Sequence, residues 1–356
     1  MKQSVSDLKP KHQAVLFPSL GYVDPKRGRC RAFIHGRVYI DGKVPLGNKI
    51  ILKGLKRKMK AAPEDFEGEP FQSRIDGFLA APGRRRRIVL QVGQQQYRLL
   101  RRTRRDGTFY GSLSLPEPIA GQLRDGEESR IVSMNLLRSQ DARGMIAATV
   151  GSIHFVPPRG LSVISDIDDT IKFTEATSST KMLTNTFLKP FEVIPGMADL
   201  YRGWQAEGCD FHYVSSSPWQ LYEALAELCL TTHFPAGSMH LRYFRVRDQL
   251  VKKLQRVRKH SKVPIIAGIL RRLPKRQFIL VGDSGEKDPE IYRFLAEKFP
   301  RQIRGILIRD IAARRMNHKR LERLIKTSQE HQVLFRVFEE PEELADVVLA
   351  LKQKIA

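Results

Sequence analysis

The chain has 356 residues, and its formal net charge at pH 7 is +24 because 62 Lys and Arg outnumber 38 Asp and Glu. Its hydrophobic content of 41% is ordinary for a globular protein and excludes a wholly disordered or collagen-like chain. No uninterrupted apolar run approaches the roughly 20 residues that cross a bilayer, so no transmembrane segment is expected. The charged start of the chain does not resemble a signal peptide, and a cytoplasmic location is the expectation. The length predicts two domains.

The positive charge is concentrated in the first half of the chain. Residues 1–150 carry 29 Lys and Arg against 14 Asp and Glu, whereas residues 151–356 carry 33 against 24. The densest basic runs are Lys53–Lys60, Arg84–Arg87 and Arg98–Arg105. Such runs attract phosphate-rich partners. The sequence leaves three interpretations of them open: docking on an anionic membrane surface, nucleic-acid binding, or a basic solvated face.

In the first half, short strand-like runs are separated by turn dipeptides, a pattern typical of an all-β domain. Arg31–Ile40 is rich in β-branched and aromatic residues and leads into Asp41-Gly42, a dipeptide typical of hairpin turns. Ile88–Leu100 and Thr108–Leu115 flank the turn dipeptide Asp106-Gly107 in the same way. A last apolar run, residues 145–156, ends at a Pro/Gly segment that indicates a linker. These short strands predict a basic β-sandwich-like domain over residues 1–157.

From residue 158 the pattern changes to short apolar runs that alternate with longer helical segments. The runs are of the kind that become buried parallel strands. They are Leu161–Ser165, Phe211–Val214, Phe278–Val281 and Ile303–Ile308. The helical segments are Gly196–Ala206, Trp219–Cys229 and Pro289–Phe299. The pattern predicts an α/β domain with an open parallel sheet over residues 158–356, and ligands of such sheets bind beyond the carboxyl ends of the strands.

Polar residues follow three of these runs. The first run is followed by Asp166-Ile167-Asp168-Asp169-Thr170, whose carboxylates repel one another unless a cation lies among them. The second is followed by Ser215-Ser216-Ser217, which offers hydroxyl and backbone N–H groups to an anion. The third is followed by Gly282–Asp288, a loop able to add one or two oxygen ligands to the same cation. Oxygen ligands favour Mg²⁺ over zinc.

These motifs resemble those of haloacid-dehalogenase-superfamily phosphatases. That superfamily is recognised by D-x-D-x-T after a strand, a serine after the next strand, a lysine on a later helix, and G-D-x-x-x-x-D. More narrowly, S-D-I-D-D-T, Y-V-S-S-S-P-W and G-D-S-G-E-K-D-P-E-I-Y resemble the catalytic domain of the actin-patch-type phosphatidate phosphatases. The resemblance covers roughly residues 160–312. It implies a haloacid-dehalogenase-like, Rossmannoid sheet.

The resemblance also implies a role for each motif residue. Asp166 would be the nucleophile that forms an aspartyl-phosphate, Asp168 would be the acid and base, and the Thr170 hydroxyl would hold Asp168 in place. Ser215 and Ser216 would bind phosphate oxygens. Magnesium would be held by three groups, with Asp288 supporting them directly or through water. The three groups are the Asp166 carboxylate, the Asp168 backbone carbonyl and Asp283.

The motif lysine has several candidates between Ser215 and Asp283, and they include Lys252, Lys253 and Lys259. Lys262 is the preferred one because it lies 21 residues before Asp283, a spacing that resembles the family's. Its neighbours Ser261 and Pro264 also indicate the start of a helix. A cation at this position would pair with the Asp166 carboxylate and with bound phosphate.

Together these features predict a magnesium-dependent phosphoric monoester hydrolase. The leading substrate is phosphatidate, which would be converted to diacylglycerol and phosphate in lipid metabolism. The enzyme would then act as a cytoplasmic, peripherally membrane-associated protein on an anionic surface. A phosphatase for a soluble or polynucleotide phosphomonoester is the alternative within enzymes. From another class, the chain could be a membrane- or nucleic-acid-binding module whose phosphatase domain is inactive.

Overall fold

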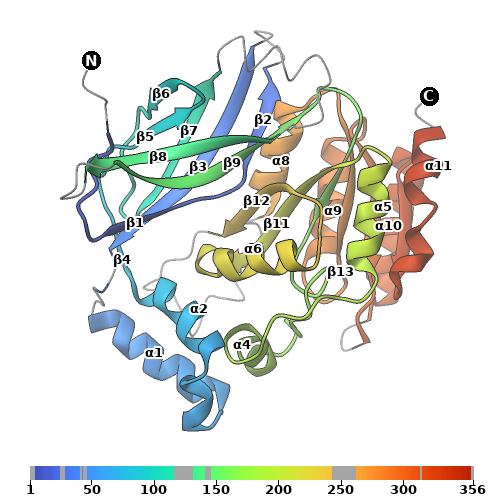
Figure 1. Cartoon of the computed structure of the whole chain (residues 1–356). Helices are drawn as coiled ribbons and strands as arrows, with labels where there is room; N and C mark the ends of the chain where they lie inside the picture. Colours follow the sequence, from blue (N-terminus) through green and yellow to red (C-terminus); the bar gives the residue numbers. More distant parts are fainter. Residues whose placement is uncertain are drawn as a thin grey trace. The chain divides into compact units, whose positions relative to one another are not determined.

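A computed structural model gives the structure of the chain (Figure 1). It describes residues 5–24, 29–40, 42, 46–115, 131–140, 146–242, 262–312 and 315–353. The chain divides into two compact units. Unit 1 comprises residues 1–49, 79–158 and 237–239, and unit 2 comprises residues 50–78, 159–236 and 240–356. One boundary between the units falls after residue 158, next to the boundary predicted after residue 157. Each unit also includes a segment from the other half of the sequence.

Unit 1 is built on one nine-stranded sheet whose strands pair antiparallel, apart from the parallel pair β2 and β9. The strands are β1 (His12–Leu16), β2 (Ser19–Val23), β3 (Cys30–Ile40), β4 (Ala81–Pro82), β5 (Val89–Val92), β6 (Gln95–Arg98), β7 (Thr108–Ser114), β8 (Ile131–Gln140) and β9 (Ile146–Val156). The main path runs β1-β3-β2-β9-β8-β5-β6, and β4 and β7 also pair with β3. Alternate side chains of these strands form one buried apolar cluster that includes Ile34, Leu90, Phe109 and Met134.

The strands of unit 1 confirm part of the sequence prediction and correct two details. Arg31–Ile40 and Thr108–Leu115 form β3 and β7, which pair with each other from Arg31 to Arg37. Ile88–Leu100 is not one strand, because a turn after Val92 folds it into the hairpin of β5 and β6. Of the Asp41-Gly42 dipeptide, only Gly42 is among the described residues, and the next element after β3 is a helix.

Unit 2 contains a six-stranded sheet in the order β12-β11-β10-β13-β14-β15. Its strands are β10 (Leu161–Ser165), β11 (Asp210–Pro218), β12 (Gly237–Arg242), β13 (Gln277–Asp283), β14 (Ile303–Arg309) and β15 (Leu334–Phe338). The strand pairs from β11 through β10, β13, β14 and β15 are parallel. All four predicted apolar runs are strands of this sheet, and β10 is buried at every position.

The strand order of this sheet determines where a ligand can bind. Numbered along the chain from β10, the strands follow the order 3-2-1-4-5-6 of the doubly wound folds. The direction of winding reverses between β10 and β13, and connections on either side of that point leave a crevice beyond the carboxyl ends of the two strands. Asp166 follows β10 and Asp283 ends β13, so both carboxylates are placed at this crevice.

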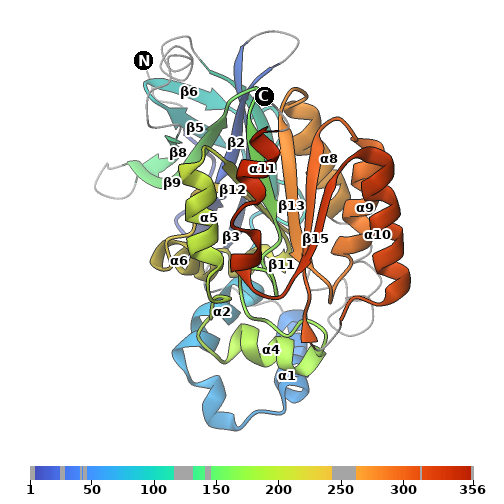
Figure 2. The ribbon, with the colours of Figure 1, turned by 90° about the vertical axis from the view of Figure 1, so that its right-hand side faces the viewer.

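Helices cover both faces of the sheet (Figure 2). They are α5 (Met197–Ala206), α6 (Tyr222–Thr231), α8 (Lys262–Arg272), α9 (Asp288–Lys298), α10 (His318–His331) and α11 (Val347–Gln353). Figure 2 shows α8, α9 and α10 on one face and α5 and α11 on the other. None of the helices in the described part of the chain is long and apolar enough to cross a bilayer.

A helical layer joins unit 2 from the first half of the sequence. It combines α2 (Glu69–Leu79) and the part of α1 (Leu46–Met59) after residue 49 with α4 (Ser179–Phe187). Phe71 and Phe78 of α2 contact Phe187 of α4, with ring centroids 6.4 and 5.2 Å apart. The buried Arg74 side chain donates hydrogen bonds to the carbonyls of Thr186 and Lys189 at 2.8 and 2.6 Å. The basic run Lys53–Lys60, predicted within the N-terminal domain, therefore belongs to unit 2.

Candidate active site

Asp166 lies directly after β10, and its side chain is 1% exposed. Its backbone N–H donates to the carbonyl of Val281 in β13 at 2.9 Å, so the residue is held at the carboxyl ends of both central strands. Lys262, the first residue of α8, places its Nζ 2.9 Å from Asp166 Oδ1. The same Nζ lies 2.6 Å from Asp288 Oδ1. One buried ammonium group thus contacts two buried carboxylates from different elements.

Asp283 and Asp288 join this group because Gly282 lets the chain approach closely. A Cβ at residue 282 would lie 2.4 Å from Asp288 Oδ2, which explains why glycine precedes Asp283. Asp288 begins α9, where the helix N-terminus favours negative charge. Asp283 Oδ1 accepts a hydrogen bond from the Glu286 N–H at 2.8 Å.

The three carboxylates of Asp166, Asp283 and Asp288 fit a divalent cation. One oxygen atom from each lies within 4.8 Å of the others. Their Oδ2 atoms are buried and lack a hydrogen-bond partner among the described residues. Among the described residues, Lys262 is the cation in ion-pair contact with this group, so one positive charge faces three carboxylates. Oxygen-only donors of this kind suit Mg²⁺.

The pKa shifts follow from the same crowding. Burial raises the pKa of the Asp166 carboxyl well above its ordinary value, Lys262 opposes this shift, and Asp288 and Asp283 add to it. Burial, Asp288 and Glu286 raise the pKa of Asp283 in the same direction. Burial would lower the pKa of Lys262, but Asp166 and Asp288 outweigh it and hold the ammonium charged. Further positive charge at this place would keep the carboxylates ionised.

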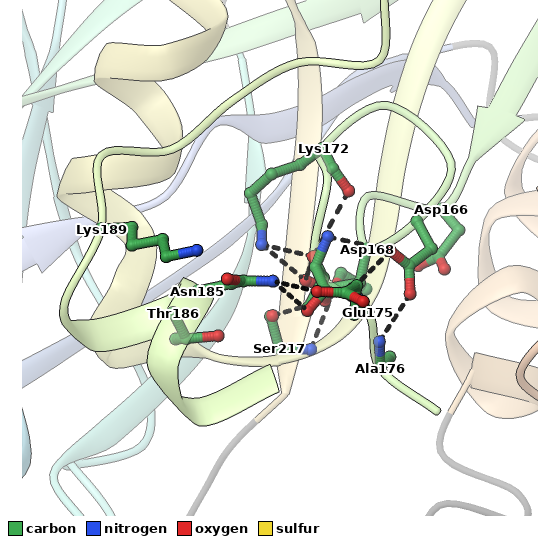
Figure 3. A network of polar contacts seen from close by, with 12 residues as sticks. Asp166, Asp168, Lys172, Glu175, Ala176, Asn185, Thr186, Lys189 and Ser217 are labelled. Atoms are coloured by element: carbon green, nitrogen blue, oxygen red, sulfur yellow. Dashed lines mark hydrogen bonds and ion pairs between the residues drawn. The ribbon is translucent and has the colours of Figure 1, made fainter. Parts of the chain in front are cut away.

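Asp168 has a different environment from Asp166, two residues away. Its Oδ1 lies 3.1 Å from the Nζ of Lys172, a lysine with no exposed surface, and accepts from Thr174 Oγ1 at 2.9 Å. Its Oδ2 accepts from Ser215 Oγ at 3.1 Å and from Ser217 Oγ at 2.5 Å. Figure 3 shows Lys172 and Ser217 pointing toward Asp168.

These contacts decide the charge of Asp168. Burial favours the neutral acid, but Lys172 and the hydrogen bond from Ser217 outweigh burial and lower the pKa of the carboxyl below its ordinary value. Asp168 is therefore ionised at neutral pH. Burial instead raises the pKa of Asp166 and favours its neutral form. Two neighbouring carboxyls with opposite shifts are typical of sites that divide acid, base and nucleophile between them.

A tight turn brings Lys172 and Thr174 back to Asp168. Asp169 has a φ of +55°, a left-handed conformation that Asp adopts more readily than most residues. Its Oδ1 accepts from the N–H groups of Thr174 and Glu175 at 2.8 Å each, and its Oδ2 accepts from that of Ala176 at 2.7 Å. The carboxylate of Asp169 thus fixes the returning chain, which is a structural role.

The remaining predicted site residues lie in the same place but differ in their contacts. Thr170 Oγ1 is buried and has no hydrogen-bond partner among the described residues, so the contact to Asp168 expected of Thr170 is made by Thr174. Ser215 Oγ donates to Asp168 and also accepts from the Ser217 N–H at 2.8 Å. Ser216, expected to bind phosphate with Ser215, is half-buried next to them in β11. The competing lysines 252, 253 and 259 lie outside the described residues.

The sequence did not indicate the contacts that Lys172, Thr174 and Ser217 make with Asp168. Ser217 belongs to the triple serine that was expected to bind an anion, and Lys172 and Thr174 carry no spacing signal of their own. The one available hint is Lys172 itself, a cation between the apolar residues Ile171 and Phe173. A charged residue in such a run is seldom buried without a partner.

Part of the chain is similar to known proteins. Residues 161–310 match the family "Phosphatidate phosphatase APP1, catalytic domain". The chain is 38% identical over 160 residues to Phosphatidate phosphatase APP1 of Saccharomyces cerevisiae. This alignment covers 44% of this chain and 27% of that protein. It is 34% identical over 180 residues to an uncharacterised Schizosaccharomyces pombe protein, covering 49% of this chain and 29% of that one. The matches thus span less than a third of either relative.

Among solved structures, an uncharacterised Listeria monocytogenes protein aligns with 55% of this chain and 99% of its own, at 10% identity and a TM-score of 0.36. An aspartate transcarbamoylase from Trypanosoma cruzi aligns with 65% of this chain at 12% identity and a TM-score of 0.17. Neither similarity is close enough to carry an argument.

The family match covers β10, β13 and β14 and includes Asp166, Lys262, Asp283 and Asp288. Residues 161–310 are therefore similar to the catalytic domain of phosphatidate phosphatase APP1.

Proposed function

We propose that the chain is a magnesium-dependent phosphatase that acts through an aspartyl-phosphate on Asp166, with phosphatidate as its substrate. The observation that supports this most is the grouping of Asp166, Asp283 and Asp288 around the Lys262 ammonium, at the point where the winding of the sheet reverses. The similarity to phosphatidate phosphatase APP1 favours the lipid over other phosphomonoesters. Under this proposal the domain is haloacid-dehalogenase-like.

In the first step, an oxygen of the Asp166 carboxylate attacks the phosphorus of the substrate. The bond from phosphorus to the diacylglycerol oxygen breaks, and that oxygen receives a proton from Asp168. Lys262 favours the ionised form of Asp166 and offers positive charge to the transferring phosphoryl group. Magnesium held by Asp166, the Asp168 carbonyl, Asp283 and Asp288 would offset the negative charge of that group.

In the second step, Asp168 accepts a proton from water, and the water oxygen attacks the phosphorus of the aspartyl-phosphate. The acyl phosphate bond then breaks and releases phosphate and free Asp166. The contacts of Asp168 suit this step, because Lys172 and Ser217 hold the carboxylate in its ionised, proton-accepting form. For the first step Asp168 needs a proton, which a singly protonated phosphate monoester can bring to the site.

Phosphate release from a panel of substrates tests the proposal. The panel contains phosphatidate in mixed micelles, a 5′-phosphorylated oligonucleotide, nucleotides and sugar phosphates, each with and without Mg²⁺. We expect release from phosphatidate with Mg²⁺ and none after exhaustive chelation. Release from the oligonucleotide or a soluble phosphate alone would overturn the lipid assignment. Asp166→Asn keeps the side-chain shape but removes the nucleophile, and residual activity above about 1% would overturn the covalent mechanism.

A further inference from the structure

Two arginine-rich loops of unit 1 meet at one place. The loop between β4 and β5 carries Arg84–Arg87, and the loop between β6 and β7 carries Arg101, Arg102, Arg104 and Arg105. The buried Thr103 joins the two loops. Its N–H donates to the carbonyl of Arg86 at 2.8 Å, and its carbonyl accepts from the N–H of Arg85 at 3.0 Å. Its Oγ1 accepts from the N–H of Arg86 at 2.8 Å.

This arrangement concentrates positive charge. We call the eight arginines and Leu100 the arginine tip. Asp7 forms an ion pair with Arg102 at 3.5 Å, and the two side chains are 41% and 53% exposed. Burial and the nearby Arg86 lower the pKa of His12, which is a sign of the positive potential there. Six of the eight arginines are exposed, and Arg86 and Arg87 are half-buried.

Leu100 adds an exposed apolar side chain to the arginine tip. Its relative exposure is 103%, the highest of the large hydrophobic residues described, whereas the preceding Leu99 is 5% exposed and packs in the core. In the sequence, Leu100 lies two residues after Arg98 and directly before Arg101 and Arg102. A leucine fully surrounded by water forgoes the free energy that it would gain in an apolar environment. Thr103, three residues later, anchors the same loop through its hydrogen bonds to Arg85 and Arg86.

We propose that the arginine tip docks the protein on anionic lipid bilayers, with the arginines at the headgroup phosphates and Leu100 inserted at the acyl boundary. The charge complementarity supports a phosphate-rich partner, and the exposed aliphatic side chain favours a bilayer over nucleic acid. Surfaces that bind single strands instead offer aromatic faces to the bases. Tyr110 beside the tip is covered by the Arg104 guanidinium, 4.7 Å from the ring centroid. The inference deepens the proposed function, since phosphatidate resides in bilayers.

Vesicle co-sedimentation tests the tip without requiring catalysis. The probe is a phosphatidylcholine vesicle containing phosphatidylserine, which is not the proposed substrate, and the protein carries Asp166→Asn. We expect binding that disappears on pure phosphatidylcholine and weakens as salt is raised. Changing Arg84–Arg87 to Gln should weaken partitioning on the order of 600-fold, because each of the four cations near the surface contributes about fivefold. Leu100→Ser should weaken it about tenfold.

Matched variants in unit 2 separate the tip from a general charge effect. Leu230→Ser removes another exposed leucine, and a second control replaces the exposed cations of α1 by Gln. These cations are Lys53, Arg57 and Lys58, together with Lys60 directly after the helix. Neither control should change partitioning by more than about twofold. Equal losses in the tip variants and the controls would overturn the assignment, as would stronger salt-sensitive binding to an oligonucleotide than to vesicles.

The same variants distinguish this inference from the proposed function. With Asp166 intact, the tip variants should lose hydrolysis of vesicle-borne phosphatidate but keep hydrolysis of a soluble phosphomonoester such as p-nitrophenyl phosphate. Surface attraction raises the local enzyme concentration and leaves the phosphoryl-transfer barrier unchanged. If the protein binds vesicles through the tip but hydrolyses no phosphomonoester, the proposed function fails while the docking surface stands. If it hydrolyses phosphatidate and ignores vesicle charge, only the docking surface fails.

Discussion

The Nζ of Lys172 lies 3.1 Å from Oδ1 of Asp168, and the lysine side chain has no exposed surface. The same Nζ donates to Thr174 Oγ1 at 2.5 Å and lies 4.7 Å from the centroid of the Phe191 ring. A lysine enclosed in this way is desolvated, and its carboxylate partner is what compensates the cost. Lys172 therefore helps to lower the pKa of Asp168, whereas Lys262 only opposes the rise in the pKa of Asp166.

Replacing Lys172 by Met should slow the second chemical step. The pKa of Asp168 would rise because its burial would remain while the cation is gone, so less of the base would be ionised at neutral pH. We expect kcat to fall about 100-fold, the scale of lost general-base catalysis, with a smaller change in KM. Phosphorylated protein should accumulate in rapid-quench experiments with a soluble phosphomonoester.

Lys181→Met is the matched control, since Lys181 belongs to the same segment but is exposed and pairs with Glu175. It should leave kcat unchanged. A Lys172→Met protein that retains its near-ultraviolet circular dichroism, shows full kcat and accumulates no phosphorylated form would contradict the role given to Lys172.

Asp283→Asn should affect stability in opposite directions with and without magnesium. Without the cation, the substitution removes one of three mutually repelling buried carboxylates, so Tm should rise. With the cation, wild-type protein should gain about 2.7 kcal/mol at a concentration 100 times the Kd, and the variant should gain less because a ligand is lost. Thermal unfolding across a Mg²⁺ titration measures both effects.

Asp199→Asn serves as its control because Asp199 is an exposed acid on α5. The control should follow the wild-type titration throughout. If magnesium stabilised Asp283→Asn as strongly and at the same concentrations as the wild type, Asp283 would not be a ligand.

The elements that the sequence predicted well are those whose signal is local. The apolar runs from Leu161 to Ile308 are parallel strands because each carries its own burial pattern, and the carboxylates after them meet because parallel strands end at one edge. The hairpin of β5 and β6 was not predicted, because the Gly93-Gln94 turn is short and both strands share one run of alternating residues.

Contacts between distant segments account for what the sequence did not indicate. Residues 50–78 lie between strands of unit 1 in the chain, and nothing in their periodicity shows that Arg74 bonds to carbonyls more than 110 residues later. The meeting of the two arginine loops depends in the same way on the hydrogen bonds of Thr103, a single residue without a motif. The packing of α4 on α2 likewise joins residues more than 100 positions apart in the sequence.

Arg74→Leu should loosen this helical layer. The substitution leaves the carbonyls of Thr186 and Lys189 without their charged donor and removes the guanidinium that lies 3.8 Å from the Phe191 ring centroid. We expect a loss of about 2–3 kcal/mol in unfolding free energy, measured by urea denaturation. Limited proteolysis should cut faster within residues 60–80.

Two further variants test whether the effect depends on geometry. Arg74→Lys keeps the charge but offers no planar fork to two carbonyls and a ring, so it should recover only part of the loss. Arg57→Leu changes an exposed cation on α1 and should leave unfolding and proteolysis as in the wild type. Equal stability of Arg74→Leu and wild type would show that α2 and α4 do not depend on this residue.

Acid should destabilise the protein through His35 of unit 1. The ring is fully buried and lies 2.9 Å from the carbonyl of Met239, and burial lowers the pKa of His35 from 6.5 to about 4. Between pH 6.5 and pH 4 the unfolded chain therefore binds a proton that the folded chain does not. Stability is complete above pH 6.5 and is lost as the pH falls toward 4, by up to about 3 kcal/mol from this residue.

Urea unfolding at pH 7.0, 5.5 and 4.5 measures this dependence. His35→Gln keeps an N–H donor for the Met239 carbonyl but does not titrate, so its stability should fall less steeply with acid than that of the wild type. The slope should not vanish, because burial also lowers the pKa of His154 to about 4. His318→Gln, which alters an exposed histidine at the start of α10, should keep the wild-type slope. If all three proteins lost stability in parallel from pH 7.0 to 4.5, the neutral, buried state of His35 would not be a source of acid sensitivity.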